Sequence, residues 1–185
     1  MVVLFSADCN YAFRHIGRQM MKIVEAANAL ATEQYGSRKG HKATDLAANK
    51  SLTHDILRQL KQPRAVCSND AKSCYDLIGH TQAAMAMHRM GVPKPAVDCI
   101  FTTLQEAIHK VRIGYGDSSD YYGGTSDNIL MHGICQGNGA GPAIWVVMSS
   151  PLLDIQRKKG VWILLLYSSA TQGGKIRGVR LCRQL

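Results

Sequence analysis

The chain has 185 residues, and 46% of them are hydrophobic, which is enough for a packed core in a domain of ordinary size and excludes disorder over the whole length. The formal net charge of +9 is concentrated at the end, because residues 155–185 contain seven Lys and Arg and no acid, whereas residues 1–154 contain 15 Lys and Arg against 13 acids. The net charge alone therefore does not predict a nucleic-acid-binding cleft in the body of the protein.

Cysteine spacing and apolar runs exclude two further classes of protein. The six cysteines form no Cys-x-x-Cys pair and no short Cys/His cluster, so they do not predict a zinc site. The apolar residues 2–5 are followed at once by Ser6 and Asp8, which is unlike a secretory signal, and the apolar run 161–167 is too short to span a bilayer. We therefore expect an intracellular protein, nuclear or cytoplasmic, with reduced cysteines and no membrane partner.

Two helices and a basic loop are predicted in the first part of the chain. Apolar residues recur at three- and four-residue steps over residues 13–30, which predicts an amphipathic helix. Residues 33–42, here called the basic loop, contain glycines and four basic or potentially basic groups in five positions, a composition that can bind phosphate. Thr44 is the predicted N-cap of a second helix, which continues until Pro63 stops it.

An acidic stretch comes after this helix. Residues 65–67 are a small β-compatible run that would place Asp70 at the end of a strand, followed by Tyr75 and Asp76. A carboxylate at a strand end can hold a metal ion, but Asp is also a common turn residue because its side chain hydrogen-bonds to nearby backbone. On this stretch alone both interpretations stay open, and a turn is the more frequent one.

Helical periodicity returns in the middle of the chain. It predicts a helix over residues 78–90, ended by Gly91 and a turn at residues 92–95, and another helix over residues 97–108. His80 and His88 are eight residues apart, too far to share a metal ion in the usual His-x-x-x-His manner. Both are therefore predicted to be ordinary helix histidines.

The last elements combine a strand with a glycine-rich segment. Alternation over residues 110–115 predicts a half-buried strand, and residues 116–128 are predicted to be a long polar connection. Residues 133–142 contain glycines that allow a close approach to a flat ligand, and Pro142 suits the first turn of a helix over residues 143–154. The loop lacks the Gly-Lys-Ser/Thr ending of a Walker A sequence.

Three of these stretches, in this order, resemble the reverse transcriptase domain of retroelements, most closely that of non-LTR-type retrotransposons. Glu33–Gly40 is similar to the fingers motif Gln-Phe-Gly-Phe-Arg-x-Gly. Asp70–Asp76 is similar to motif A, Asp-Ala-x-x-Ala-Phe-Asp, with the same separation of its acids. Gly133–Pro142, here called the motif B loop, is similar to motif B, Gly-x-x-Gln-Gly-x-x-x-Ser/Gly-Pro. The resemblance covers roughly residues 10–154.

The resemblance implies RNA-templated DNA synthesis by two-metal nucleotidyl transfer. Its partners would be an RNA template, a DNA primer and deoxynucleoside triphosphates, and its cofactor would be Mg²⁺. Asp70 would be the catalytic carboxylate that binds the metal ions, and Tyr75 would be the aromatic gate against a 2′-hydroxyl. The remaining nucleotide-binding residues, which would contact the triphosphate or line the pocket of the nascent base pair, would be Arg38, Lys39, Gln136 and Gly137.

One part of the family pattern is missing. Motif C, which ends in Asp-Asp and comes after motif B, should supply the remaining metal carboxylate, but no acid follows Asp154. Because one aspartate cannot hold two divalent ions, the chain as written is expected to be inactive. We hypothesise that the reading frame slips near Gly160, since a one-base shift of the codons for residues 174–184 permits a sequence ending in Val-Asp-Asn, which resembles a decayed motif C.

The expected fold is α+β, a partial right-hand polymerase with fingers and an incomplete palm, in which helices pack on a small, mainly antiparallel sheet. Residues 1–63 would be a fingers-like helical segment with the basic loop, residues 64–154 a palm-like segment with motifs A and B, and residues 155–185 a basic tail, out of frame if the hypothesis holds. Two alternatives stay open. One is a non-catalytic retroelement remnant or nucleic-acid-binding module, and the other is an unrelated helical interaction protein. The oligomeric state is left open.

Overall fold

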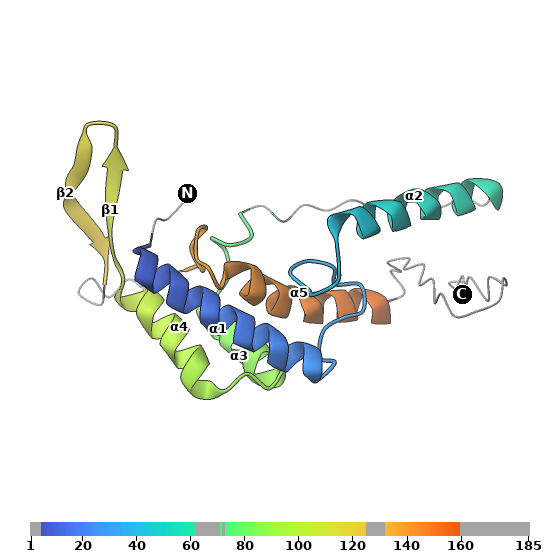
Figure 1. The fold of residues 1–185 in the computed structure, drawn as a ribbon, viewed down its shortest axis with the longest axis horizontal. Helices are drawn as coiled ribbons and strands as arrows, with labels where there is room; N and C mark the ends of the chain where they lie inside the picture. Colours follow the sequence, from blue (N-terminus) through green and yellow to red (C-terminus); the bar gives the residue numbers. More distant parts are fainter. Residues whose placement is uncertain (1–4, 62–70, 72, 125–131, 160–185) are drawn as a thin grey trace. The chain divides into compact units, whose positions relative to one another are not determined.

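The computed structural model describes residues 5–61, 71, 73–124 and 132–159. Within these residues the chain forms five helices and a two-stranded antiparallel sheet, which confirms the predicted α+β class (Figure 1). The predicted strand near residues 65–70 lies outside the described residues. The elements, in chain order, are α1 (Ala7–Ala26), α2 (Ala43–Gln59), α3 (His80–Arg89), α4 (Lys94–Glu106), β1 (Ile108–Ile113), β2 (Gly116–Gly123) and α5 (Gly141–Lys158).

The first two helices lie where the hydrophobic periodicity predicts them, but both begin earlier. α1 begins after Ser6, whose Oγ accepts a hydrogen bond from the backbone N–H of Cys9 at 3.3 Å. α2 begins after Lys42, whose backbone N–H donates to the Asp45 carboxylate at 3.0 Å. The prediction of Thr44 as N-cap is therefore wrong. Because Asp45 already binds the free N–H at the helix start, Thr44 lies inside the first turn.

A tight turn separates α3 from α4. Gly91 has a φ of +83°, which favours glycine, and the N–H of Val92 donates to the carbonyl of Met87 at 3.0 Å. The predicted turn at residues 92–95 is shorter than expected, because α4 already begins at Lys94. Pro95 lies in the first turn of α4, where its missing N–H has no intrahelical acceptor to lose.

The two strands form a hairpin that stands away from the helices at the end of α4 (Figure 1). The prediction of residues 116–128 as a connection is wrong for residues 116–123, which form β2 and pair with β1 from Ile108 opposite Gly123 to Ile113 opposite Gly116. Because most residues of β2 are polar, the strand has no hydrophobic alternation that would predict it. The same polar residues stabilise its pairing with β1. Arg112 donates to both carboxylate oxygens of Asp117, at 2.6 and 3.0 Å.

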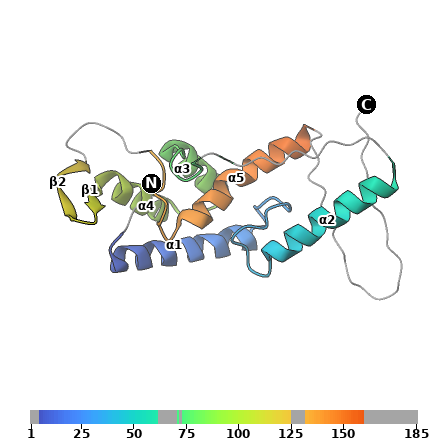
Figure 2. The same ribbon diagram turned by 90° about the horizontal axis from the view of Figure 1, so that it is seen from above.

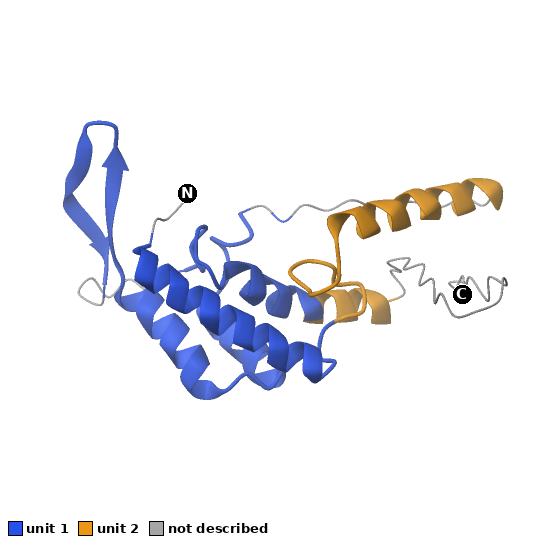
Figure 3. Cartoon of the chain, viewed as in Figure 1, with its two compact units in different colours: residues 1–30, 71–150 blue, residues 31–70, 151–185 orange. Residues whose placement is uncertain are grey.

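The chain divides into two compact units (Figure 3). Unit 1 comprises Met1–Leu30 and Ala71–Ser150, and unit 2 comprises Ala31–Asp70 and Pro151–Leu185. In unit 1 the helices α1, α3, α4 and the first part of α5 lie side by side (Figure 2). Their apolar faces form one core. Each of these helices contributes a side chain with no exposed surface, namely Val24, Met87, Ile100 and Ile144. No helix within the described ranges is both long and apolar enough to cross a membrane.

Gly17 allows close packing of α1 against the residues that lead into α5. A Cβ on Gly17 would lie 3.1 Å from the Cα of Ala140, closer than nine in ten such contacts in proteins. We expect Gly17→Val to lower the free energy of unfolding by about 1–3 kcal/mol, because the branched side chain fits only if backbone moves. Urea titration followed by circular dichroism measures the change.

The matched control is Gln19→Val, which introduces the same side chain at an exposed position of the same helix. This control measures the change in the free energy of unfolding that results from the lower helix propensity of valine, without any change in core packing. Equal unfolding midpoints for the two variants would contradict the close contact at Gly17.

Candidate functional site

The stretches that resemble motifs A and B lie side by side in unit 1. The N–H of Ile134 donates to the carbonyl of Tyr75, and the N–H of Gly133 donates to the carbonyl of Ile78, both at 2.8 Å. Gly133 has a φ of +82°, and a Cβ there would lie 2.7 Å from the Tyr75 carbonyl oxygen. Only glycine fits this position without a backbone shift, so the pairing requires the residue that begins the motif B loop.

The Tyr75 ring packs against the beginning of α5. It makes an edge-to-face contact with Trp145, with 6.4 Å between ring centroids, and a Cβ on Gly141 would lie 3.5 Å from the ring. The side chain is half-buried. Burial, with a smaller effect of the nearby Cys74 thiol, raises the pKa of Tyr75, so its hydroxyl stays protonated and neutral at physiological pH.

A buried asparagine organises the motif B loop. Asn138 is 4% exposed, its Nδ2 donates to the carbonyl of Ile134 at 3.1 Å, and its Oδ1 accepts from the N–H of Ala140 at 2.9 Å. Gln136 and Gly137 are exposed on this turn, and Gly137 has a φ of +116°, which glycine tolerates best. The sequence analysis missed Asn138, although an asparagine between two glycines is a recognisable turn signal.

His80 links the two stretches to α4, and the prediction that it is an ordinary helix histidine is wrong. The carbonyl of Gly133 can only accept, so His80 Nε2 donates to it at 2.6 Å, and Nδ1 accepts from Gln105 Nε2 at 2.5 Å. Burial lowers the pKa of His80, and nearby His132 adds to this effect against the opposing bond to Gly133. The ring is therefore neutral, with one defined tautomer.

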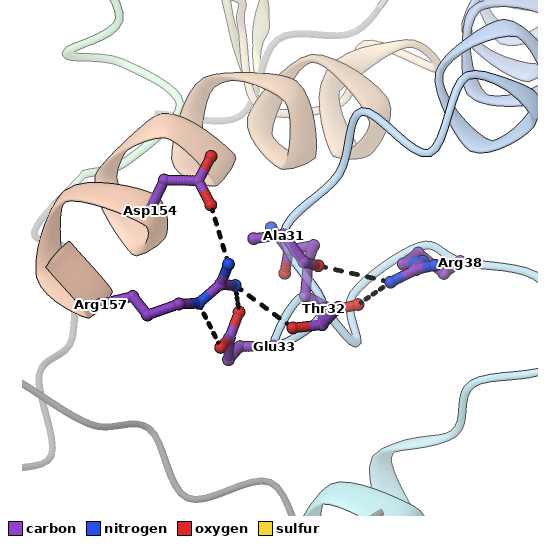
Figure 4. Close-up of polar contacts among 7 residues, drawn as sticks. Ala31, Thr32, Glu33, Arg38, Asp154 and Arg157 are labelled. Carbon is purple, nitrogen blue, oxygen red and sulfur yellow. Dashed lines mark hydrogen bonds and ion pairs between the residues drawn. The ribbon is translucent and has the colours of Figure 1, made fainter. Parts of the chain in front are cut away.

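The basic loop belongs to unit 2, where a polar network holds it (Figure 4). Arg38 Nη1 donates to the carbonyls of Ala31 and Gln34, at 3.4 and 3.2 Å. These bonds fix the guanidinium at the inner side of the turn, whereas Lys39 is exposed. Arg38 is thus positioned by its own loop before any ligand arrives.

An ion pair connects this loop to the last turns of α5, also in unit 2. Arg157 Nε donates to Glu33 Oε1 at 2.8 Å, and its Nη2 binds the second Glu33 oxygen and Thr32 Oγ1 (Figure 4). The Glu33 side chain is only 10% exposed. Burial favours its protonated form, but the hydrogen bonds and charge of Arg157 prevail, so the pKa of Glu33 is lowered. The sequence analysis missed this pair, because no spacing rule connects residues so far apart.

Comparison with known proteins identifies the family. A family model described as reverse transcriptase (RNA-dependent DNA polymerase) matches residues 6–168. The chain belongs to this family. No curated protein and no solved structure matches it significantly. The resemblance derived from the three motifs is therefore confirmed at the level of the reverse transcriptase domain.

The predicted site residues are divided between the two units. Tyr75, Gln136 and Gly137 belong to unit 1, whereas Arg38 and Lys39 belong to unit 2. Asp70 lies outside the described residues.

The family uses Mg²⁺ and binds a template, a primer and deoxynucleotides. The Asp70 carboxylate has the right chemistry for Mg²⁺, which prefers carboxylate oxygens. The described ranges, however, contain no group of three or more His, Cys, Asp or Glu that could hold a metal ion. A site for two divalent ions needs more than one carboxylate.

The neutral state of His80 predicts a pH dependence of stability. Because the folded-state pKa is below that of the unfolded chain, the contribution is fully present above the unfolded value, near 6.5, and is lost as the pH falls. We expect the free energy of unfolding to decrease between pH 7.5 and pH 5 more steeply for the natural chain than for His80→Gln. Urea titrations at several pH values measure both slopes.

Parallel slopes for the two proteins would contradict a half-buried, neutral His80. Burial also lowers the pKa of His109, but both proteins retain this histidine, so the difference between the two slopes reports His80 alone.

The ion pair of Glu33 predicts a second effect on stability. Glu33→Gln should lower the free energy of unfolding by about 1–2 kcal/mol, since it removes the closer and more buried of the two carboxylates that pair with Arg157. Asp154→Asn is the matched control, because Asp154 is farther from Arg157, at 3.5 Å, and more exposed. It should cost less than about 0.5 kcal/mol. Equal losses in thermal or urea unfolding would show that the Glu33 pair has no special role.

Proposed function

We propose that this chain is a polymerase domain of a retroelement of the non-LTR retrotransposon type, and that its chemistry is RNA-templated DNA synthesis. Membership of the reverse transcriptase family supports the reaction class. The observation that carries the proposal is the backbone pairing of Tyr75 and Ile78 with Ile134 and Gly133. It joins the stretches that resemble motifs A and B, which in a polymerase surround the incoming nucleotide.

Each proposed role follows from a residue's chemistry. Asp70 would bind Mg²⁺, which supplies activation of the primer hydroxyl and charge stabilisation of the leaving pyrophosphate. Tyr75 would form the wall against a 2′-hydroxyl, and its contact with Trp145 supports a rigid ring. Its neutral hydroxyl would not repel a triphosphate. Gln136 and Gly137, exposed on the turn that Asn138 organises, would line the pocket of the nascent base pair.

The basic loop would bind the triphosphate. Arg38 supplies a permanent positive charge that attracts phosphate oxygens, and Lys39 adds an exposed positive charge. The bonds from Arg38 to Ala31 and Gln34 support this role, because a guanidinium that is already ordered loses less entropy on binding. The expected segments, fingers-like residues 1–63, palm-like residues 64–154 and basic tail 155–185, are part of the same proposal.

The chain as written would lack activity. No acid follows Asp154 in these 185 residues, so the carboxylates of motif C would come from a reading frame restored near Gly160, from a longer form of the gene product or from another chain. Residues 160–185, which carry the frame hypothesis, lie outside the described residues. Sequencing the transcript tests the hypothesis, and it fails if no single-base change opens a frame with an Asp-Asp pair.

The alternative function is a non-catalytic nucleic-acid-binding module. The observation that favours it is the same absence of acids after Asp154, together with seven basic residues in the tail. Such a module would bind RNA or DNA with strong salt dependence but would not extend a primer. The two functions therefore differ in one measurable reaction.

Primer extension on an RNA template with Mg²⁺ and deoxynucleotides decides between them. We expect no extension by the 185-residue chain and extension by the frame-restored chain, because only the latter would carry both acidic motifs. In the frame-restored chain, Asp70→Asn should reduce the rate by at least about 10³-fold, since an amide is a far weaker ligand for Mg²⁺ than a carboxylate. Asp76→Asn is the matched control and should retain most of the activity.

If the 185-residue chain extends the primer and its Asp70→Asn variant does not, the proposal that its active site is incomplete is wrong. A frame-restored chain that binds a primer–template duplex but never extends it would favour the binding module.

A further inference from the structure

α1 has a cationic face that the proposed active site does not use. Arg14, Arg18 and Lys22 are exposed at four-residue intervals, and no Asp or Glu occurs between Asp8 and Glu25. At about 100° per residue these three side chains fall within a narrow arc of the helix. Phe13, Gly17, Met20 and Val24 form a separate, buried face of the same helix. Arg14, Arg18 and Lys22 are here called the cationic face.

The dimensions of this face match a nucleic-acid strand. Four residues of helix rise by about 6 Å, so the three cations extend over about 12 Å. A strand of a duplex has one phosphate per roughly 3.4 Å of its axis, so the face is long enough for about three consecutive phosphates. Tyr11, which is 72% exposed, shares the same side of the helix and adds an aromatic surface for a sugar or base.

The cationic face begins beside the motif B loop. A Cβ on Gly139 would lie 2.9 Å from the Cβ of Arg14 and 2.7 Å from the carbonyl oxygen of Asn10. Gly139 is two residues from Gly137, which we assign to the nucleotide pocket, and all these residues belong to unit 1. The row of positive charges thus starts next to the pocket and runs along α1.

We infer that the cationic face of α1 binds the phosphate backbone of the primer–template duplex. The choice of duplex rests on the proposed polymerase function, whereas the binding of phosphates rests on charge and spacing alone. Two arginines favour phosphate, because each can donate two parallel hydrogen bonds to its oxygens. A membrane-surface role does not fit, since a helix lying on lipid inserts its apolar face and that of α1 is buried in the core.

The test measures binding of a fluorescently labelled RNA–DNA duplex to the full 185-residue chain by anisotropy, between 50 and 200 mM KCl. The variant Arg14→Gln/Arg18→Gln/Lys22→Gln keeps side chains with good helix propensity, so α1 should stay folded, which circular dichroism checks. We expect its affinity at 150 mM KCl to fall at least about tenfold. The slope of log K against log[salt] should fall by about 2 to 3, as three phosphate contacts are lost.

The matched control removes three exposed cations elsewhere in unit 1, with Arg89→Gln/Lys94→Gln/Lys110→Gln. It lowers the net charge equally and should change affinity by less than about twofold. Equal losses in both variants would overturn the inference, because net charge and not the cationic face would then determine binding. If the Arg14→Gln/Arg18→Gln/Lys22→Gln variant loses affinity for polyglutamate by the same factor as for the duplex, the assignment of the face to nucleic acid is wrong.

This binding assay is independent of catalysis. If the frame-restored chain fails to extend primers while the cationic-face variant loses binding selectively, the polymerase function fails and the surface stands. If extension occurs and the variant binds normally, the polymerase function stands and the surface fails.

Discussion

The backbone pairing between residues 75–78 and residues 133–134 is the constraint on which the site depends. Two hydrogen bonds of 2.8 Å join segments that are more than 50 positions apart. Glycine is the only residue type that fits at position 133, because a Cβ there would clash with the backbone of the other segment. The pairing also positions the neighbouring side chains of both segments. It places the Tyr75 ring against the first turn of α5, and it starts the loop that exposes Gln136 and Gly137.

A neutral histidine extends this constraint to the helical core. The imidazole of His80 binds the Gly133 carbonyl and the Gln105 amide, so it connects the motif B loop to both α3 and α4. A charged ring would have two donors and no acceptor for the Gln105 N–H, and it would have to lose hydration on burial. The lowered pKa and the hydrogen-bond pattern therefore have the same physical origin, since both require the neutral tautomer.

The sequence predicted what local patterns encode. Apolar spacing located α1, α3 and α4, because burying one face of a helix imposes a period of 3.6 residues. It also located α2, although α2 has no buried residue, and Pro142 located α5. The order of the three motifs predicted the reverse transcriptase family. β2 was missed because its Asp-Ser-Ser-Asp run is exposed and carries no alternation of hydrophobic residues. His80 and the pair of Glu33 with Arg157 were missed for a different reason, since their partners come close only in the folded chain and no spacing rule identifies them.

Charge distribution shows why totals mislead. Residues 1–154 are nearly balanced in charge, which argues against a basic cleft if only the sum is considered. Yet the acids and bases are not mixed evenly within this segment. On α1 the two acids lie at the ends, Asp8 in the first turn and Glu25 in the last, and only cations lie between them. Electrostatic interactions are screened beyond about 8–10 Å at physiological ionic strength. A phosphate near the middle of α1 would therefore interact mainly with the cations of α1 and little with the charges of the rest of the chain.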